Sequence, residues 1–128
     1  MRQFLEDTCV VEELDAAMCE ALTDATGPDG RVTLAEVEAA HLLLNRVDAA
    51  GTVFRYHHLF GELLRHGLLA REPERFRAQH CKAAEHFVST GDISAAVRHY
   101  WIGGRSDLGA NLMRTNLLDA YLTAGTPP

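Results

Sequence analysis

The stretch that decides the fold is LLNRVDAAGTVFRYHHLFGELLR, Leu43–Arg65. Two short runs, Asn45–Asp48 and Val53–Tyr56, carry β-branched and aromatic residues on either side of a turn that contains Gly51. This pattern is typical of a β-hairpin. From His58 onward the apolar residues recur with a period of 3.6, which predicts a helix that Pro73 brings to an end. A hairpin that leads directly into a helix is therefore the centre of the predicted fold.

Helices are predicted on both sides of this centre. Upstream, an apolar stripe predicts a continuous helix over Val10–Leu22, and the capping box Thr33–Glu36 starts a second helix near Leu34, with His41 and Leu44 on its inward stripe. Downstream, three further helices are predicted, from Pro73 to about Ser89, from Asp92 to Gly103, and from about Asp107 to Leu122. The residues expected to face inward are Leu59, Phe60, Leu63, Leu64, Leu68, Phe76, His80, Phe87, Val88, Tyr100 and Trp101.

The predicted fold class is mainly α. Residues 1–72 are expected to form a winged-helix-like module with a short β-hairpin, and residues 73–128 to form α-solenoid, TPR-like helices. Small residues, Ala83, Ala84, Ala95 and Ala96, stand where neighbouring helices of the second part must approach closely. Because fewer than two repeats are present and about three are normally needed for stability, the second part is expected either to pack on the first or to begin a longer array.

Charge and composition exclude several classes of function. The chain has 128 residues and a net charge of −6; residues 1–52 hold 3 basic against 11 acidic residues, which opposes a role in holding DNA through its phosphates. The acidic residues Glu6, Asp7, Glu12, Glu13, Asp15 and Glu20 are expected to form a solvated face. No apolar run approaches the ~20 residues that span a bilayer, no membrane partner is expected, and the three cysteines suggest reduced thiols in a cytoplasmic protein.

Three segments in order resemble one known family. LEDTCVVEELDAAMCEALTD, AEVEAAHLLLNRVDAAGTVFRYHHLFGELLR and FRAQHCKAAEHFVSTGDISAAVRHY are similar to consecutive parts of the MalT-like, ATP-dependent LuxR-type transcriptional regulators, which belong to the STAND class of P-loop ATPases. The resemblance covers about residues 3–110. It implies a fragment that contains the winged-helix subdomain and the start of the helical arm. The chain has no GxxxxGK[ST] phosphate loop and no terminal DNA-binding helix-turn-helix.

The resemblance also implies a nucleotide site. In the RYHxLF pattern of the family, the histidine that senses the β-phosphate of ADP corresponds to His57, whereas His58 occupies a variable position. Arg55, two residues earlier on the same strand face, could help to hold phosphate. The alternatives are that His57 only caps the following helix or satisfies the hairpin, and that Arg55 is solvated or pairs with an acidic residue of the first helices. ATP or ADP is expected only in the full-length architecture, and no cofactor in the isolated chain.

Other clusters are interpreted as structural. His80, Cys81 and His86, with His99, invite a metal interpretation, but His80 and His86 do not share a helix face, so we expect no metal and a packed core histidine at position 80. Cys9, Cys19 and Cys81 lie where apolar residues would serve, which opposes a Cys–His catalytic pair. No catalytic residue is predicted, and the chain is not expected to be an enzyme.

Two functions remain open. The first is a regulatory, interdomain part of a LuxR-type regulator that senses nucleotide state, with a nucleotide-binding domain as its partner in cis or in trans and with no DNA binding of its own. The second is a free-standing α-helical protein–protein interaction module, or a fragment that forms homo-oligomers. An exposed apolar face around Trp101, Leu112, Met113 and Leu117 would favour self-association.

Overall fold

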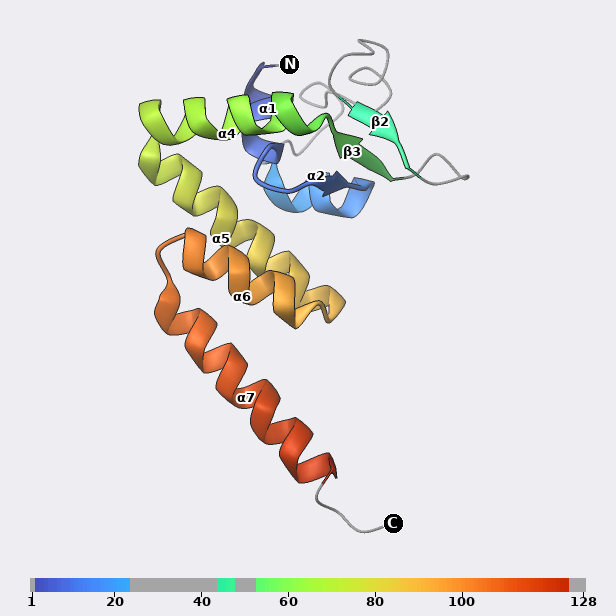
Figure 1. Ribbon diagram of the computed structural model, residues 1–128, viewed down its shortest axis with the longest axis vertical. Coiled ribbons are helices and arrows are strands. Elements are labelled where there is room, and N and C mark those ends of the chain that lie inside the picture. The colour runs from blue at the N-terminus through green and yellow to red at the C-terminus, as the bar shows by residue number, and fades with distance from the viewer. Residues whose placement is uncertain (1, 24–43, 48–52, 125–128) are drawn as a thin grey trace.

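The computed structural model describes residues 2–23, 44–47 and 53–124, and Figure 1 shows their arrangement. The elements are α1 (Arg2–Thr8), β1 (Glu13–Leu14), α2 (Ala16–Leu22), β2 (Leu44–Arg46), β3 (Phe54–Tyr56), α4 (His58–Arg71), α5 (Pro73–Thr90), α6 (Ile93–Ile102) and α7 (Ser106–Ala124). The predicted helix from Leu34, its His41 and the hairpin turn at residues 48–52 lie outside the described residues. Leu44, predicted on that helix, is in β2 instead.

A small antiparallel sheet confirms the predicted hairpin and adds a strand to it. The strand order is β1-β3-β2, with Arg55 of β3 opposite Glu13 on one side and Asn45 on the other. Along β3 the side chains alternate, so that Phe54 and Tyr56 are buried whereas Arg55 is exposed. The alternation follows from the period of two in a strand. It fixes which residues before α4 point to the core and which point outward.

The predicted continuous helix over Val10–Leu22 is wrong. The first helix ends at Thr8, strand β1 follows a turn, and α2 begins after Asp15, whose carboxylate accepts a hydrogen bond of 2.8 Å from the Met18 N–H. Val10, Val11 and Leu14 are buried in the turn and strand, at 4%, 2% and 0% exposure. Apolar residues at these positions therefore reach the core without a helix, because a turn and a short strand can present the same side chains to it.

One hydrophobic core extends from the N-terminal module into α5. Its buried members are Phe4, Leu5, Cys9, Val10, Val11, Leu14, Met18, Leu22, Phe54, Tyr56, Leu68, Phe76 and Ala83. The hydroxyl of Tyr56 shares a hydrogen bond with the Thr8 hydroxyl and also donates to the Leu5 carbonyl, which ties the central strand to α1. Because Phe76 and Ala83 belong to α5, the first arm helix is part of the same core as the winged helix.

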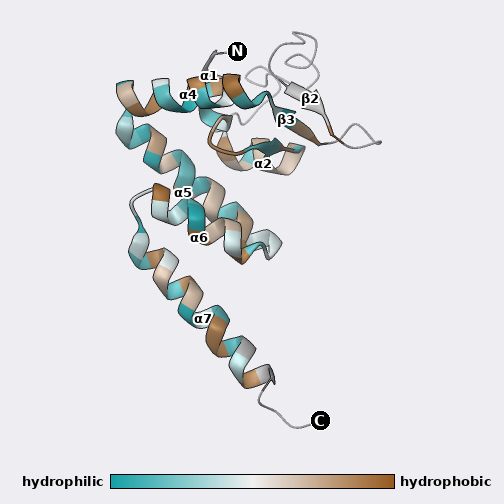
Figure 2. Cartoon of the chain, viewed as in Figure 1, coloured by the Kyte–Doolittle hydropathy of each residue, from teal (hydrophilic) through white to brown (hydrophobic). Residues whose placement is uncertain are grey.

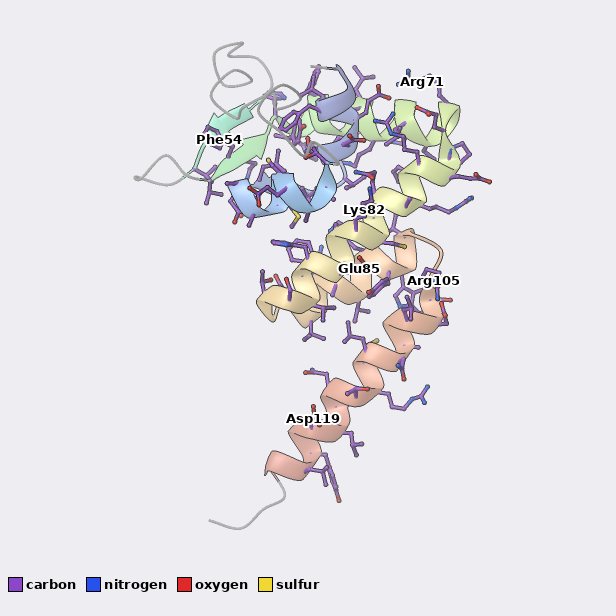
Figure 3. The ribbon with its side chains drawn as sticks, turned by 180° about the vertical axis from the view of Figure 1, so that it is seen from behind. Phe54, Arg71, Lys82, Glu85, Arg105 and Asp119 are labelled. Carbon is purple, nitrogen blue, oxygen red and sulfur yellow. The ribbon has the colours of Figure 1, made fainter. Side chains whose placement is uncertain are left out.

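Polar contacts reinforce the joint between α4 and α5, where Glu72 is the only linking residue. The buried amide of Gln79 donates to the carbonyls of Asp7 and Leu22, at 2.8 and 2.7 Å. Arg71, labelled at the end of α4 in Figure 3, contacts Glu6 at 3.1 Å. Arg75 contacts the Asp7 carboxylate at 2.6 Å. We call this set the joint cluster.

The joint cluster corrects the expectation of a fully solvated acidic face. Glu6 is only 5% exposed, and Asp7 is half-buried. Their carboxylates lie toward the guanidinium groups of α4 and α5 rather than toward water. A buried carboxylate requires such partners because the loss of its hydration is costly. Glu12, Glu13, Asp15 and Glu20 are exposed, as predicted.

The arm helices pack in sequence, each on the one before it. Gly91 ends α5 with φ +87°, and Asp92 then caps α6 by accepting a hydrogen bond from the Ala95 N–H. The helices α5 and α6 lie side by side, and all four of the small residues predicted at their contact, Ala83, Ala84, Ala95 and Ala96, are at most 2% exposed. Helix α7 contacts α6 at its start and then points away from the rest of the molecule (Figure 1).

Four apolar side chains predicted to face inward are exposed. Leu59 and Leu63 of α4 are 68% and 69% exposed, and Trp101 of α6 is 56% exposed. In α4 the buried or half-buried face consists of Phe60, Leu64 and Leu68. Leu59 and Leu63 lie beside this face and are exposed to solvent. Val88, at the end of α5, is also exposed.

Helix α7 carries apolar residues that no described element covers. Figure 2 shows hydrophobic segments along its length, and the exposed ones are Met113, Leu117, Leu118, Tyr121 and Leu122. Leu112 is half-buried. The apolar surface expected around Trp101, Met113 and Leu117 is therefore present, whereas self-association through it stays a prediction.

The close approach of α5 to the end of α6 predicts a large difference between two glycine substitutions. At Gly103 an added Cβ would lie 2.7 Å from the Cys81 sulfur and 2.9 Å from the Arg77 carbonyl oxygen. We expect Gly103→Ala to lower the free energy of unfolding by about 1–3 kcal/mol through overpacking. Gly67→Ala in α4, whose nearest neighbour would be the tip of Arg71 at 3.6 Å, should instead stabilise by about 0.5–1 kcal/mol. Urea denaturation of both variants checks this, and equal effects would contradict it.

Candidate functional site

His57 occupies the junction between β3 and α4. It is the residue that precedes α4, with φ −58° and ψ 129°, and its side chain is exposed and makes no capping hydrogen bond. Its carbonyl accepts the first hydrogen bond of the helix, from the Gly61 N–H at 2.8 Å. His57 is therefore the N-cap residue by position, but the alternative that its side chain caps the helix is wrong. The imidazole remains available for a contact outside the described part of the chain.

Arg55 lies on the outward face of the same strand. Arg55 is exposed between the buried residues Phe54 and Tyr56, and His57 is exposed as well. This agrees with the prediction that Arg55 and His57, two residues apart, lie on the same face. The Arg55 guanidinium contacts the carboxylate of Glu13 on the adjacent strand β1. The alternative of an acidic partner is therefore confirmed, although Glu13 lies in a strand rather than in a first helix. Both side chains are more than half exposed, so the pair contributes at most about 1 kcal/mol to stability.

Together these groups can receive an anionic oxygen. The start of α4 has free backbone N–H groups and a partial positive charge, since the first turn of any helix lacks internal acceptors. His57 and Arg55 add an imidazole and a guanidinium next to that helix start. Neighbouring His58 differs from His57 because it already lies 3.4 Å from Glu62, one turn along α4. The structure thus places His57, the residue that the resemblance implies for phosphate, and Arg55, suggested by strand alternation, next to the start of α4.

The histidines of the arm form a buried pair. His80 is 3% exposed and His99 is 9% exposed, and their Nδ1 atoms are 2.8 Å apart. His80 packs edge-on to Phe76, and Phe87 stacks on His99. Burial lowers the pKa of His80 to about 3, with further contributions from His99 and Arg65, and lowers the pKa of His99 to about 4. The predicted packed and hydrogen-bonded core histidine at position 80 is confirmed.

Metal and thiol chemistry find no support in the described residues. Over residues 2–23, 44–47 and 53–124 no group of three or more His, Cys, Asp or Glu side chains is placed to hold a metal ion. Cys9, Cys19 and Cys81 are free cysteines. Burial raises the pKa of Cys9 to about 11 and that of Cys19 to about 12, and it also raises the pKa of Cys81. Their reactive thiolate forms are therefore scarce at neutral pH.

Comparison with known proteins agrees with this arrangement of wing, helix and arm. The family model described as the MalT winged helix domain matches residues 1–76, which include the sheet, α4 and the first turn of α5. The chain belongs to the MalT winged helix domain family. Its relatives include proteins called HTH-type transcriptional regulator MalT from Klebsiella pneumoniae subsp. pneumoniae, 33% identical over 122 residues, and from Cronobacter sakazakii, 30% identical over 118 residues.

The MalT relatives are much longer than this chain. Each alignment covers 92% of the chain but only 12% of the relative. The resemblance to MalT-like regulators, based on the three quoted segments, is thereby confirmed. The winged-helix module followed by arm helices is confirmed as well, whereas the boundary between residues 72 and 73 stays a prediction. In the described part of the chain no helix is both long and apolar enough to cross a membrane.

Sequence reasoning missed the joint cluster. Its members lie far apart in the chain, from Glu6 and Asp7 to Arg75 and Gln79, and only folding brings them together. One signal was available. Gln79 stands between Phe76 and the buried alanines of α5, and an amide in such a place requires buried hydrogen-bond partners. The partners themselves are two backbone carbonyls, which every residue has, so the sequence does not identify them.

Proposed function

We propose that this chain is the winged-helix and first-arm segment of a longer MalT-like transcriptional regulator, where it senses the nucleotide state of an adjoining nucleotide-binding domain. The observation that carries the proposal is the match of 92% of the chain to one segment of transcriptional regulators. In this role the segment has no catalytic activity of its own. It contacts bound ADP or ATP together with the nucleotide-binding domain, in cis or in trans, in the cytoplasm.

His57 is proposed as the phosphate sensor, with Arg55 in support. The imidazole is exposed, uncapped and adjacent to the start of α4, so it can donate a hydrogen bond to a phosphate oxygen that the helix N–H groups also attract. The guanidinium of Arg55 keeps N–H groups beyond the one that contacts Glu13. Loss of the β-phosphate contact would release the winged helix from the nucleotide-binding domain.

Direct DNA binding is not part of the proposed role. The outward face of α4 carries Leu59 and Leu63, whose side chains offer neither the hydrogen-bond donors nor the positive charge that base edges and phosphates require. The net charge of −6 also opposes binding to the negatively charged DNA backbone. A mobility-shift assay with duplex DNA at low salt tests this, and salt-sensitive binding by the chain alone would contradict it.

The test of the sensor role uses the longer regulator and compares two adjacent histidines. We expect His57→Ala to weaken ADP binding by about tenfold, the effect of one lost hydrogen bond to a charged group, and to raise transcription in the absence of inducer. His58→Ala is the matched control, because His58 is also exposed but its side chain lies 3.4 Å from Glu62. Calorimetric titration with ADP gives the affinities. Unchanged ADP affinity in His57→Ala would remove His57 from the proposal.

A second candidate function is self-association through the apolar surface of α6 and α7. It rests on Trp101, Leu117 and Tyr121, which are 56%, 64% and 74% exposed. Apolar surface of this kind favours burial against another apolar surface. Sedimentation velocity over a range of protein concentrations tests this alternative, and a monomer at all concentrations would exclude the homo-oligomer.

A further inference from the structure

Glu13 faces Arg55 across the sheet, beside the proposed phosphate contact. Strand β1 pairs with β3 in antiparallel register, which places Glu13 directly opposite Arg55. The Glu13 carboxylate accepts a hydrogen bond of 2.5 Å from Nη2 of Arg55. Both side chains are more than half exposed, so the pair lies open on the outward face of the sheet. A carboxylate therefore already occupies part of the guanidinium that the proposed function assigns to phosphate.

The residues on either side of Glu13 fix its position. Leu14 is fully buried, and the Glu12 carbonyl accepts a hydrogen bond of 3.1 Å from the Tyr56 N–H. These contacts hold β1 against β3 at both of its neighbouring positions. Because side chains alternate along a strand, the burial of Leu14 turns Glu13 outward. The backbone thus holds the carboxylate next to the guanidinium of Arg55.

A carboxylate in this place competes with phosphate for Arg55. Carboxylates and phosphates bind to the same fork of guanidinium N–H groups. The N–H group that contacts Glu13 is lost to the phosphate, and the negative charge of Glu13 partly cancels the positive charge of the guanidinium. The remaining N–H groups of Arg55 can still donate to a phosphate oxygen. Glu13 therefore weakens the contact between Arg55 and phosphate without abolishing it.

The size of this competition is limited by solvent. An ion pair between two exposed side chains is worth little, because water screens the charges and the side chains lose freedom when they pair. Loss of the Glu13 charge should therefore change phosphate affinity by several-fold rather than by orders of magnitude.

We propose that Glu13 attenuates the phosphate contact of Arg55 and thereby keeps the bound nucleotide exchangeable. This inference rests on the proposed function, in which His57 and Arg55 contact the phosphate. It adds Glu13 to the same site with the opposite sign of effect, since loss of Arg55 weakens nucleotide binding and loss of the Glu13 charge strengthens it. Changes of affinity within one interface act mainly on dissociation, so Glu13 shortens the time for which ADP stays bound.

The test is a calorimetric titration of the longer regulator with ADP. We expect Glu13→Gln to bind ADP about three- to fivefold more tightly, because glutamine keeps the size of the side chain and removes its charge. Glu12→Gln is the matched control, since it removes the same charge from the neighbouring exposed residue and should leave the affinity nearly unchanged. At about 1 M salt, where the Debye length is about 3 Å, the gain in Glu13→Gln should disappear.

A double variant shows whether Glu13 acts through Arg55. In an Arg55→Gln background, Glu13→Gln should have no further effect on ADP affinity. The inference is overturned if Glu13→Gln alone leaves the affinity unchanged, or weakens it, because a weaker affinity means that Glu13 orients Arg55 for phosphate. A gain that persists in the Arg55→Gln background, or that Glu12→Gln reproduces, also overturns it.

The variant His57→Ala separates this inference from the proposed function. If His57→Ala and Arg55→Gln both leave ADP affinity unchanged, the proposed phosphate site is wrong, and the role of Glu13 falls with it. If only His57→Ala weakens ADP binding, Arg55 and Glu13 leave the site and His57 stays. If both variants weaken binding but Glu13→Gln does not strengthen it, the proposed function stands and the role of Glu13 is wrong.

Discussion

Replacement of Gln79 by methionine should cost about 3 kcal/mol of folding free energy, although the two side chains have nearly the same size and shape. The Gln79 amide donates to the carbonyls of Asp7 and Leu22, and the side chain is 4% exposed. Methionine fills the volume but donates nothing, so both carbonyl oxygens lose their side-chain donor inside the protein. The cost of each buried unsatisfied group is typically about 1–3 kcal/mol.

Urea denaturation of Gln79→Met and of a neighbouring control checks this expectation. Ala78→Met places the same side chain one residue away, at an exposed position of α5, and should change the free energy of unfolding by less than about 0.5 kcal/mol. The contrast between the variants isolates the two hydrogen bonds from helix propensity. A value for Gln79→Met within the range of the control would show that the joint does not depend on this amide.

Acidification from pH 7.5 to pH 5 should remove about 4 kcal/mol of folding free energy through the His80–His99 pair, about 2 kcal/mol for each histidine. Burial lowers the pKa of His80 from 6.5 to about 3 and that of His99 from 6.5 to about 4. As the pH falls below 6.5, the unfolded chain therefore binds protons that the folded chain does not. The stability contribution is fully present above pH 6.5 and is lost as the pH falls toward the folded pKa values.

The measurement is the free energy of unfolding from urea titrations at half-unit intervals between pH 5 and pH 7.5, a window that lies above the usual pKa of carboxyl groups. His99→Gln removes one member of the pair and should reduce the loss on acidification by about half. His66→Gln removes an exposed histidine of α4 and serves as the matched control. A His99→Gln variant that loses as much stability as the unsubstituted chain would contradict the prediction.

The downstream helices were predictable because their ends carry local chemical signals. Pro73 begins α5, Gly91 ends it in a left-handed conformation, and Asp92 caps α6. The hairpin was predictable for the same reason. The start of the chain was not, because the turn between α1 and β1 contains no glycine or proline and its apolar residues also fit a helical stripe. Asp15 is the local signal for the start of α2, but the sequence pattern led us to assign it to the solvated acidic face.

Burial was less predictable than secondary structure because it depends on neighbours that the local pattern does not specify. Leu59 and Leu63 have the spacing of core residues, yet they are 68% and 69% exposed, and Trp101 is 56% exposed although its ring lies against Gly109 of α7. Glu6 shows the opposite case, since its charge suggested water and its position places it against Arg71. For the site, the positions of Arg55 and His57 followed from strand alternation, whereas the pairing of His80 with His99 required two helices to meet.

The single-residue link at Glu72, with a shared core and the joint cluster on one side of it, has a mechanical consequence. Because the shared core and the joint cluster hold α4 and α5 together, we expect a rotation of the wing to turn α5 with it. The 18 residues of α5 span about 27 Å. A tilt of about 10° at the wing would therefore move the far end of α5 by about 5 Å, the length of one helical turn. A small tilt of the wing would in this way move the surface at the far end of α5 by several ångströms.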